Sequence, residues 1–112
     1  MKFMMLVCWA EGEERGPEES AAMRRDSIAW MEQMDARGVR LQGSRLRPVA
    51  DARTVRVRGE DVLVVDGPFA ETKEQIAGYD LLECADLDEA VEVASRHPVA
   101  RCGAIEVRPY WD

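Results

Sequence analysis

The stretch Thr54-Val55-Arg56-Val57-Arg58-Gly59-Glu60-Asp61-Val62-Leu63-Val64-Val65 decides the fold. Its first five residues alternate between polar and apolar side chains, which predicts a half-buried strand with Val55 and Val57 facing inward. A turn follows at residues 59–60, and the continuous apolar run 62–65 is typical of a strand that is covered on both faces. The stretch therefore predicts a β-hairpin.

An amphipathic helix of about 20 residues is expected before the hairpin. Pro17 suits its first turn, and Gly38 is a natural stop. The apolar stripe of this helix consists of Met23, Ser27, Trp30, Met31 and Met34. We expect this stripe to pack on a sheet, and the lining of a ligand pocket is the alternative.

A second helix is expected after the hairpin. Asp86 is its N-cap, Glu89 stands three residues later as in a capping box, and Pro98 forbids continuation past His97. The helix dipole favours a protonated imidazole at this end, so His97 is expected to cap the helix, with a switch or a catalytic acid as the alternative. The predicted buried stripe consists of Leu87, Ala90, Val91 and Ala94.

Three more strands are expected at residues 2–9, 76–84 and 104–110, while residues 39–50 are predicted to be irregular and partly extended. The order β-α-β-β-β-α-β predicts an α+β fold, a ferredoxin-like antiparallel sheet with two helices on one face. The helices cover only one side of the sheet, yet the first strand and the run 62–65 are apolar on both sides. We therefore expect a second copy on the open face, which makes a symmetric homodimer.

Length and charge restrict the function classes. The 112 residues and 12.6 kDa predict a single domain, residues 1–112. The net charge of -7 argues against a nucleic-acid or anionic-membrane partner, because the mean field repels phosphate. The first nine residues are too short for a signal peptide, and no apolar run is long enough to span a membrane, so a cytoplasmic location is expected.

Neither a metal nor a cofactor is expected. The cysteines Cys8, Cys84 and Cys102 are odd in number and contain no C-x-x-C pair, and His97 is the only histidine. The sequence contains no phosphate-binding loop, no dinucleotide-binding fingerprint and no nucleophile elbow.

Charge is distributed unevenly along the chain. Residues 37–58 contain seven Arg and one acid, a local charge of +6, whereas residues 59–112 sum to -9. The basic segment is predicted to bind an anionic ligand or the acidic part of a partner, and a solvated or internally paired face is the alternative.

The charged run 66–74, directly after the hairpin, offers candidate catalytic groups. Asp66 is a candidate general base if burial or a neighbouring acid such as Glu74 moves its pKa toward neutrality. The alternative is a structural carboxylate that accepts hydrogen bonds from turn N–H groups. Lys73, one of only two lysines among 15 basic residues, is either an anion-binding ammonium or the partner of a nearby carboxylate.

Candidate binding residues lie on the later strands. Glu106 and Arg108 share one strand face, where Arg108 either grips a substrate carboxylate or forms a salt bridge with Glu106. Tyr79 presents its hydroxyl to a pocket or packs in the core. Phe69, in the turn before them, completes the candidate binding set.

The run Asp66-Gly67-Pro68-Phe69-Ala70-Glu71-Thr72-Lys73-Glu74 resembles the DGPF family, part of the YCII-related superfamily. Further matches follow the family's order along the chain. They are Gly43-Ser44-Arg45-Leu46-Arg47-Pro48, Thr54-Val55-Arg56, Gly78-Tyr79, Asp86-Leu87-Asp88-Glu89-Ala90 and Glu106-Val107-Arg108-Pro109. The resemblance implies a dimeric ferredoxin-like α/β-barrel fold.

The resemblance implies less about chemistry. Some relatives in the wider superfamily resemble lyases or dehalogenases of small aromatic or lactone substrates, and DGPF proteins are often encoded beside extracytoplasmic-function sigma factors. Wider YCII proteins are thought to use a His-Asp pair with the His in the first half of the chain. This sequence has no His before His97, which argues against a histidine-based mechanism here.

Two functions therefore compete. The first is a metal-free lyase, isomerase or dehalogenase acting on a small anionic or aromatic molecule, with Asp66 as the base and Lys73 and Arg108 holding negative charge. The second is a non-catalytic module that binds a ligand or a protein, such as a sigma factor.

Overall fold

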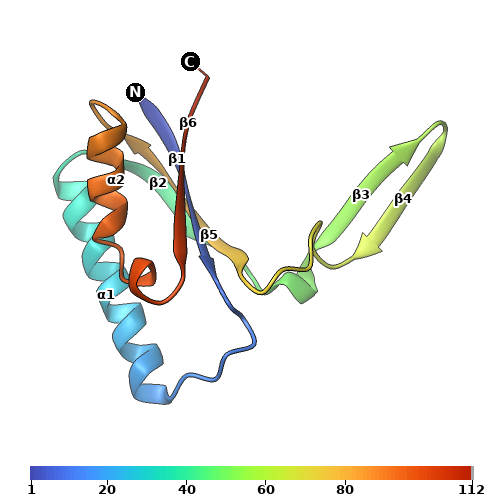
Figure 1. Cartoon of the computed structure of the whole chain (residues 1–112), viewed down its shortest axis with the longest axis horizontal. Helices are drawn as coiled ribbons and strands as arrows, with labels where there is room; N and C mark the ends of the chain where they lie inside the picture. Colours follow the sequence, from blue (N-terminus) through green and yellow to red (C-terminus); the bar gives the residue numbers. More distant parts are fainter. Residues whose placement is uncertain (112) are drawn as a thin grey trace.

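A computed structural model describes residues 1–111 as a four-stranded sheet with two helices, from which a separate two-stranded hairpin projects (Figure 1). The elements in chain order are β1 (Lys2–Trp9), α1 (Pro17–Ala36), β2 (Arg40–Arg45), β3 (Arg53–Arg58), β4 (Asp61–Asp66), β5 (Gln75–Glu83), α2 (Leu87–Ser95) and β6 (Ala104–Pro109), with 3-10 turns η1 (Val49–Asp51) and η2 (Pro98–Arg101).

The predicted α+β class is confirmed. The large sheet has the strand order β2-β5-β1-β6, and every neighbouring pair is antiparallel. Without β3 and β4 the chain runs β-α-β-β-α-β, the element order of ferredoxin-like folds. Within residues 1–111, no helix is both long and apolar enough to cross a bilayer.

One detail of the predicted topology is incomplete and another is wrong. The segment predicted to be irregular and partly extended contains the regular edge strand β2, whose polar sequence RLQGSR lacks the apolar alternation of a half-buried strand. The hairpin β3–β4 is a sheet of its own rather than part of the main sheet, and the single chain does not form a barrel. Periodicity identifies strands, but it does not say which neighbour each strand pairs with.

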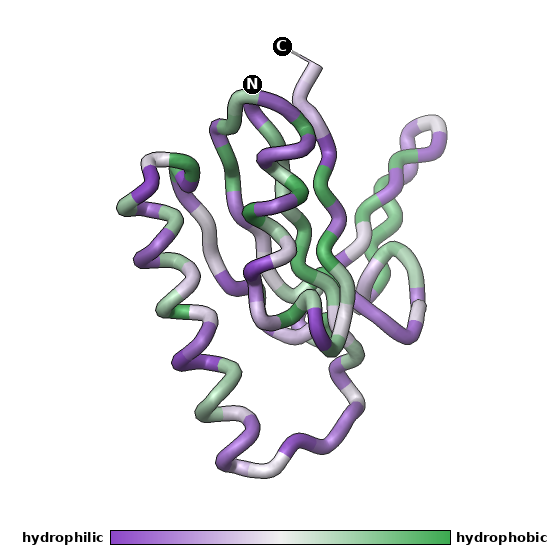
Figure 2. The backbone as a smooth tube through the Cα atoms, turned by 60° about the vertical axis from the view of Figure 1, so that its left-hand side comes forward, coloured by the Kyte–Doolittle hydropathy of each residue, from purple (hydrophilic) through white to green (hydrophobic). Residues whose placement is uncertain are grey.

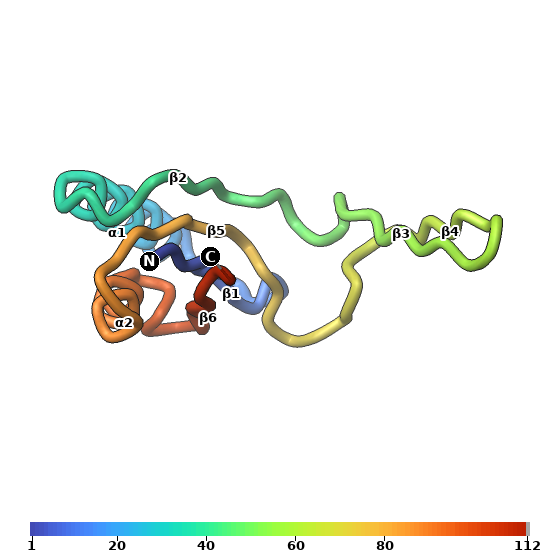
Figure 3. Tube along the Cα trace, turned by 90° about the horizontal axis from the view of Figure 1, so that it is seen from above, coloured from blue at the N-terminus to red at the C-terminus, as the bar shows by residue number. Residues whose placement is uncertain are grey.

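The core lies between the sheet and the two helices, which cover the same side of the sheet (Figure 3). Alternate residues of β1, namely Phe3, Met5 and Val7, point into it. From α1 it receives Trp30 and Met34, as the predicted stripe required. The indole Nε1–H of Trp30 donates a 3.0 Å hydrogen bond to a main-chain carbonyl of α2 and so links the helices.

The second helix is confirmed at both ends. The Asp86 carboxylate accepts a 2.9 Å hydrogen bond from the Glu89 N–H, and the Glu89 side chain accepts one from the Ala85 N–H. The buried stripe differs by one position from the predicted one. Leu87 and Val91 are exposed, whereas the stripe that faces the core consists of Ala90, Val93 and Ala94.

A buried ion pair ties β2 to β5. Arg40 Nε lies 2.8 Å from an Asp80 carboxylate oxygen, and the Arg40 guanidinium also reaches Asp35 on α1 at 3.1 Å. Burial raises the pKa of Asp80 and outweighs the opposite effect of Arg40. Gly43 is required here, because a Cβ at this position would lie 2.1 Å from an Asp80 oxygen.

The hairpin of β3 and β4, residues 53–66, is called the arm below. It extends from the side of the main sheet opposite the helices (Figures 1 and 3). The Cα radius of gyration is 15.9 Å, against roughly 13 Å for a compact domain of about 100 residues. The prediction that residues 62–65 are covered on both faces is wrong for the single chain, because all four are exposed.

Candidate functional site

The side of the main sheet away from the helices carries most of the predicted binding residues. Met4, Leu6 and Cys8 alternate with the core residues of β1, and they are half-buried. Residues directly opposite one another in an antiparallel pair share a face, so the strand register assigns the neighbours on β5 and β6. We call this surface the helix-free face; its members are Met4, Leu6, Cys8, Ile76, Tyr79, Leu81, Glu106 and Arg108.

Glu106 and Arg108 form an ion pair on this face, as one of the two predicted alternatives requires. They stand opposite Leu6 and Met4 respectively, so the charged pair borders the apolar middle of the face. The Arg108 side chain is exposed and free to change partner. Because an exposed ion pair contributes little to stability, an anionic ligand can replace the Glu106 carboxylate at small cost.

Tyr79 lies near the centre of the helix-free face. It stands between Leu6 of β1 and Ser44 of β2 and is half-buried, which places it on the open side of the sheet rather than in the core. A tyrosine at such a position offers an aromatic surface and a hydroxyl that both donates and accepts hydrogen bonds.

Cys8 is a site residue that sequence reasoning missed. Burial raises the pKa of its thiol, and the carboxylates of Glu106 and Glu74 raise it further. Cys8 therefore stays protonated at neutral pH and is not a ready nucleophile. The alternation of β1 would have placed it beside Met4 and Leu6. Glu106 stands opposite Leu6 on the neighbouring strand, and Glu74 directly precedes β5 at the end of the sheet from which the arm extends.

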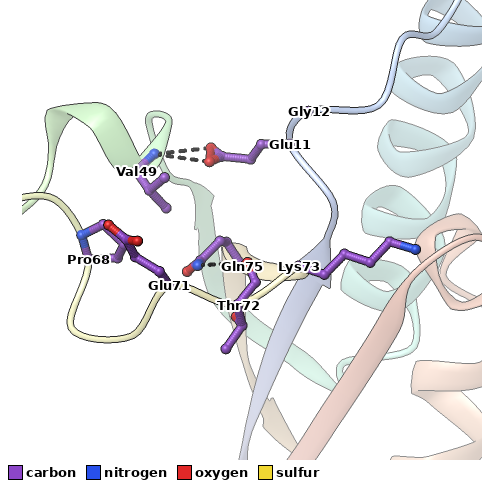
Figure 4. Close-up of a pocket in the computed structure, with 8 residues that line it drawn as sticks. All are labelled: Glu11, Gly12, Val49, Pro68, Glu71, Thr72, Lys73 and Gln75. Carbon is purple, nitrogen blue, oxygen red and sulfur yellow. Dashed lines mark hydrogen bonds between the residues drawn. The ribbon is translucent and has the colours of Figure 1, made fainter.

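A second feature is a hollow of about 260 Å³ where the arm joins the sheet (Figure 4). The Glu11 carboxylate closes one side and accepts hydrogen bonds of 3.0 and 3.3 Å from the Val49 N–H. Lys73 extends away from Pro68 and Glu71, and it forms no ion pair with any other residue in the described range 1–111. The lining residues are Glu11, Gly12, Val49, Pro68, Glu71, Thr72, Lys73 and Gln75.

Asp66 and Phe69 belong to the arm and its base. The Asp66 carboxylate is exposed and lies 2.9 Å from Arg53 Nε, so its partner is the facing strand rather than the turn N–H groups. The turn is held instead by the Thr54 hydroxyl, which donates to the Gly67 carbonyl at 2.9 Å. Phe69 is exposed, with the Arg56 guanidinium carbon 5.5 Å from its ring centroid.

The structure thus separates the predicted site residues into two groups. Tyr79, Glu106 and Arg108 share the helix-free face, with Glu74 at its end. Asp66, Phe69 and Lys73 lie on the arm and around the hollow at its base. Within one chain, Asp66, Lys73 and Arg108 do not line a single hollow. Asp66 and Lys73 lie near the base of the arm because they are close in sequence, whereas the sheet register places Arg108 opposite Met4.

His97 caps a helix, but not in the expected form. It is buried against Trp30, with ring centroids 4.9 Å apart, and its Nδ1 accepts a 3.1 Å hydrogen bond from the Val99 N–H at the start of η2. Burial lowers the pKa of His97 from 6.5 to about 4. The imidazole is therefore neutral, and the expected protonated imidazole at the end of the preceding helix is wrong because burial outweighs the helix dipole.

The basic segment 37–58 is only partly neutralised within the chain. Arg37, Arg40, Arg47 and Arg53 each pair with a carboxylate. Arg45, Arg56 and Arg58 form no ion pair with the residues that the structure describes, and Arg56 and Arg58 both lie on β3 of the arm. Two of the three unpaired arginines therefore lie on the arm, although its residues 53–66 contain three arginines and three acids and carry no net charge.

Two comparisons with known proteins found similar sequences. The family of YCII-related domains matches residues 1–112, the full length of the sequence. An uncharacterised protein of Rhizobium meliloti (strain 1021) is 40% identical over 94 residues, which cover 82% of this chain and 76% of that protein.

Proposed function

We propose that this chain, which belongs to the family of YCII-related domains, is a homodimeric protein that binds a small carboxylate-bearing molecule with an apolar body on its helix-free face. A single observation carries the proposal. An apolar floor of half-buried side chains, Met4, Leu6 and Leu81, is bordered by one aromatic hydroxyl and one exposed guanidinium, those of Tyr79 and Arg108.

This combination suits a small organic anion. Ligand sites are mostly apolar, with a few polar groups that fix orientation. Arginine binds carboxylates with two parallel hydrogen bonds, and Arg108 already holds the carboxylate of Glu106. The apolar body of the ligand would pack on Leu6 and against the ring of Tyr79.

The proposal includes a second copy because the helix-free face of one chain is too open to bury a ligand. Half-buried apolar side chains on a sheet surface indicate an interaction surface, and two-fold pairing of identical chains is the commonest way to cover one. The dimer also brings the two groups of predicted residues closer, since the arm of each chain extends on the helix-free side of its own sheet (Figure 3).

Catalysis, if present, would use carboxylates of the face. When a ligand carboxylate takes Arg108, Glu106 loses its ion-pair partner, and its carboxylate becomes free to accept a proton from the ligand. Glu74 lies at the same end of the face, near Cys8. In this scheme Glu106 replaces Asp66 as the candidate base, whereas a binding module would use the same contacts without turnover.

Benzoate and its neutral analogue benzamide are suitable probes. We expect benzoate to raise the melting temperature at millimolar concentration and benzamide not to, because only the carboxylate engages Arg108. Arg108→Gln should weaken benzoate binding by about 10-fold or more, the loss of one charge-assisted pair. The matched control is Arg101→Gln, since Arg101 is an exposed arginine in the turn η2.

Two results would overturn the assignment. One is equal binding of benzoate and benzamide, and the other is an equal effect of Arg108→Gln and Arg101→Gln. If sedimentation at micromolar concentration showed only monomer, the proposed homodimer would be refuted.

A further inference from the structure

The arm exposes more apolar surface than an isolated hairpin tolerates. The register places four valines on one face, where Val55, Val57, Val62 and Val64 are 59%, 57%, 65% and 58% exposed. On the other face, Leu63 stands opposite Arg56 and Val65 opposite Thr54. Figure 2 shows this hydrophobic content along both strands. A two-stranded hairpin alone is marginally stable in water, and large exposed apolar patches indicate interaction surfaces.

The body of the same chain does not cover the arm. Among residues 1–111, the side-chain contacts of β3 and β4 stay within the arm and its base: Arg53 with Asp66, Thr54 with Gly67, and Arg56 with Phe69. Within its own chain, the arm is therefore held by the pairing of its two strands.

We propose that the arm of each protomer lies across the helix-free face of a second copy, with its four-valine face on the apolar floor there, so that two chains exchange arms. This inference rests on the homodimer of the proposed function and names the segment that covers the ligand site. The arm already stands on the helix-free side of its own sheet, so a second copy that approaches this face meets the arm (Figures 1 and 3).

The charges of the arm are consistent with the valine face making the contact. Arg56 and Arg58 lie on the other face of the arm, opposite Leu63 and Asp61. On the valine face the charged side chains are Arg53 and Asp66, which pair with each other at the base of the arm. The exchange is reciprocal, as a two-fold contact requires.

Dimensions agree as well. Each arm strand has six residues, which span about 20 Å, and β1 has eight residues, about 26 Å. A two-stranded ribbon thus fits within the length of the sheet when two β layers pack face to face at about 10 Å.

Arm exchange would also complete the ligand site. The valine face of the partner's arm would close over the apolar floor and over a ligand body that packs on it. The site would then be built from both chains, and a protomer without a partner would bind benzoate weakly.

Photo-cross-linking from the arm tests the contact. A benzophenone amino acid at position 57 is introduced into chains labelled with ¹⁴N or ¹⁵N, which are mixed and irradiated. We expect cross-links between heavy and light chains that join position 57 to peptides of β1 or β5. The matched control places the same group at position 65, on the opposite face of the arm, where such cross-links should be several-fold fewer. Cross-links within one chain only, or from arm to arm, would overturn the proposal.

Variants of the same side-chain shape measure how much the valines contribute to the stability of the dimer. The quadruple variant Val55→Thr, Val57→Thr, Val62→Thr, Val64→Thr keeps the β-branched shape and removes apolar surface. We expect the dimer dissociation constant from sedimentation equilibrium to rise on the order of 100-fold, as loss of several buried methyl groups implies. The control pair Leu63→Thr, Val65→Thr should change it by less than about 10-fold.

The outcomes separate this inference from the proposed function. If the quadruple variant dimerises like the parent chain while Leu6→Arg abolishes dimerisation, arm exchange is refuted and the homodimer through the helix-free face stands. If the parent chain is monomeric, both are refuted. If the quadruple variant is monomeric and also loses benzoate binding, the arm covers the site as proposed.

Discussion

Valines behave in opposite ways in the two parts of this molecule. In the body, Val7 and Val93 are 8% and 0% exposed because helices and sheet close around them. In the arm, Val57 and Val62 remain more than half exposed, although they sit in equally regular strands. Regular strands therefore bury their valines only where helices of the same chain cover the sheet, and the topology decides where that happens.

One ion pair in the body and one in the arm show the same contrast between a buried and an exposed position. Arg40–Asp80 in the body and Arg53–Asp66 in the arm have nearly the same N–O distance, 2.8 and 2.9 Å. Their side chains differ in exposure, 11% and 11% in the body against 54% and 84% in the arm. Equal geometry therefore carries unequal energy, because water screens the arm pair and not the body pair.

The largest effect is expected in the core of the body. Phe3→Ala leaves a cavity at a fully buried position and should lower the free energy of unfolding by about 4 kcal/mol, as large core truncations do. Val62→Ala in the arm should change it by less than about 0.5 kcal/mol at concentrations where the chain is monomeric. Urea denaturation of both variants measures the difference, and equal losses would show that the arm packs within its own chain.

The two ion pairs give the next largest contrast. Asp80→Ala leaves Arg40 buried with only Asp35 as a partner and should cost about 3 kcal/mol, since breaking a buried pair strands a charge. Asp66→Ala should cost less than about 0.5 kcal/mol. Thermal or urea unfolding at neutral pH checks both, and a costly Asp66→Ala in dilute protein would contradict the exposed position of the arm.

The stability of the body should also depend on pH through His97. Its pKa is about 4 in the folded chain against 6.5 ordinarily, so the unfolded chain binds the extra proton first as pH falls. Stability is fully present above pH 6.5 and falls toward pH 4 by up to about 1.4 kcal/mol per pH unit. His97→Asn should remove this dependence, measured as the difference between the two chains, and parallel pH profiles would refute it.

The smallest effect is expected at a helix end. Asp86→Ala removes the carboxylate that accepts the Glu89 N–H and should lower the free energy of unfolding by about 1 kcal/mol, the usual value of an N-cap. Asp88→Ala, also in the first turn of α2, removes a charge without removing the cap and serves as the control. Equal losses would show that the dipole rather than the hydrogen bond matters.

Local patterns predicted most of the body. Pro17, Gly38 and the Met–Trp stripe located the first helix, and Asp86 with Glu89 located the second, because caps and amphipathic stripes act over one or two turns. The strand β2 escaped prediction because an edge strand with few apolar residues has little periodicity. The buried Arg40–Asp80 pair escaped as well, since its partners are 40 residues apart.

The candidate site was predicted less well than the fold. Alternation placed Glu106 and Arg108 together, because positions two apart in a strand share a face. The grouping of Tyr79 and Cys8 with them depends on the register of three strands, and the separation of Asp66 from Arg108 depends on the direction in which the arm leaves the sheet. The strand register and the direction of the arm both depend on contacts between residues that are far apart in the sequence.

The amino-acid order alone specified both helices, most of the strands, and that the run 62–65 is an apolar strand. Those properties follow from side-chain period, capping and turn chemistry, which act between near neighbours in the chain. The folded arrangement settled that this run stands in a projecting arm and that the sheet keeps one face free of helices. Such facts come from long-range pairing, whose energy depends on which distant surfaces meet.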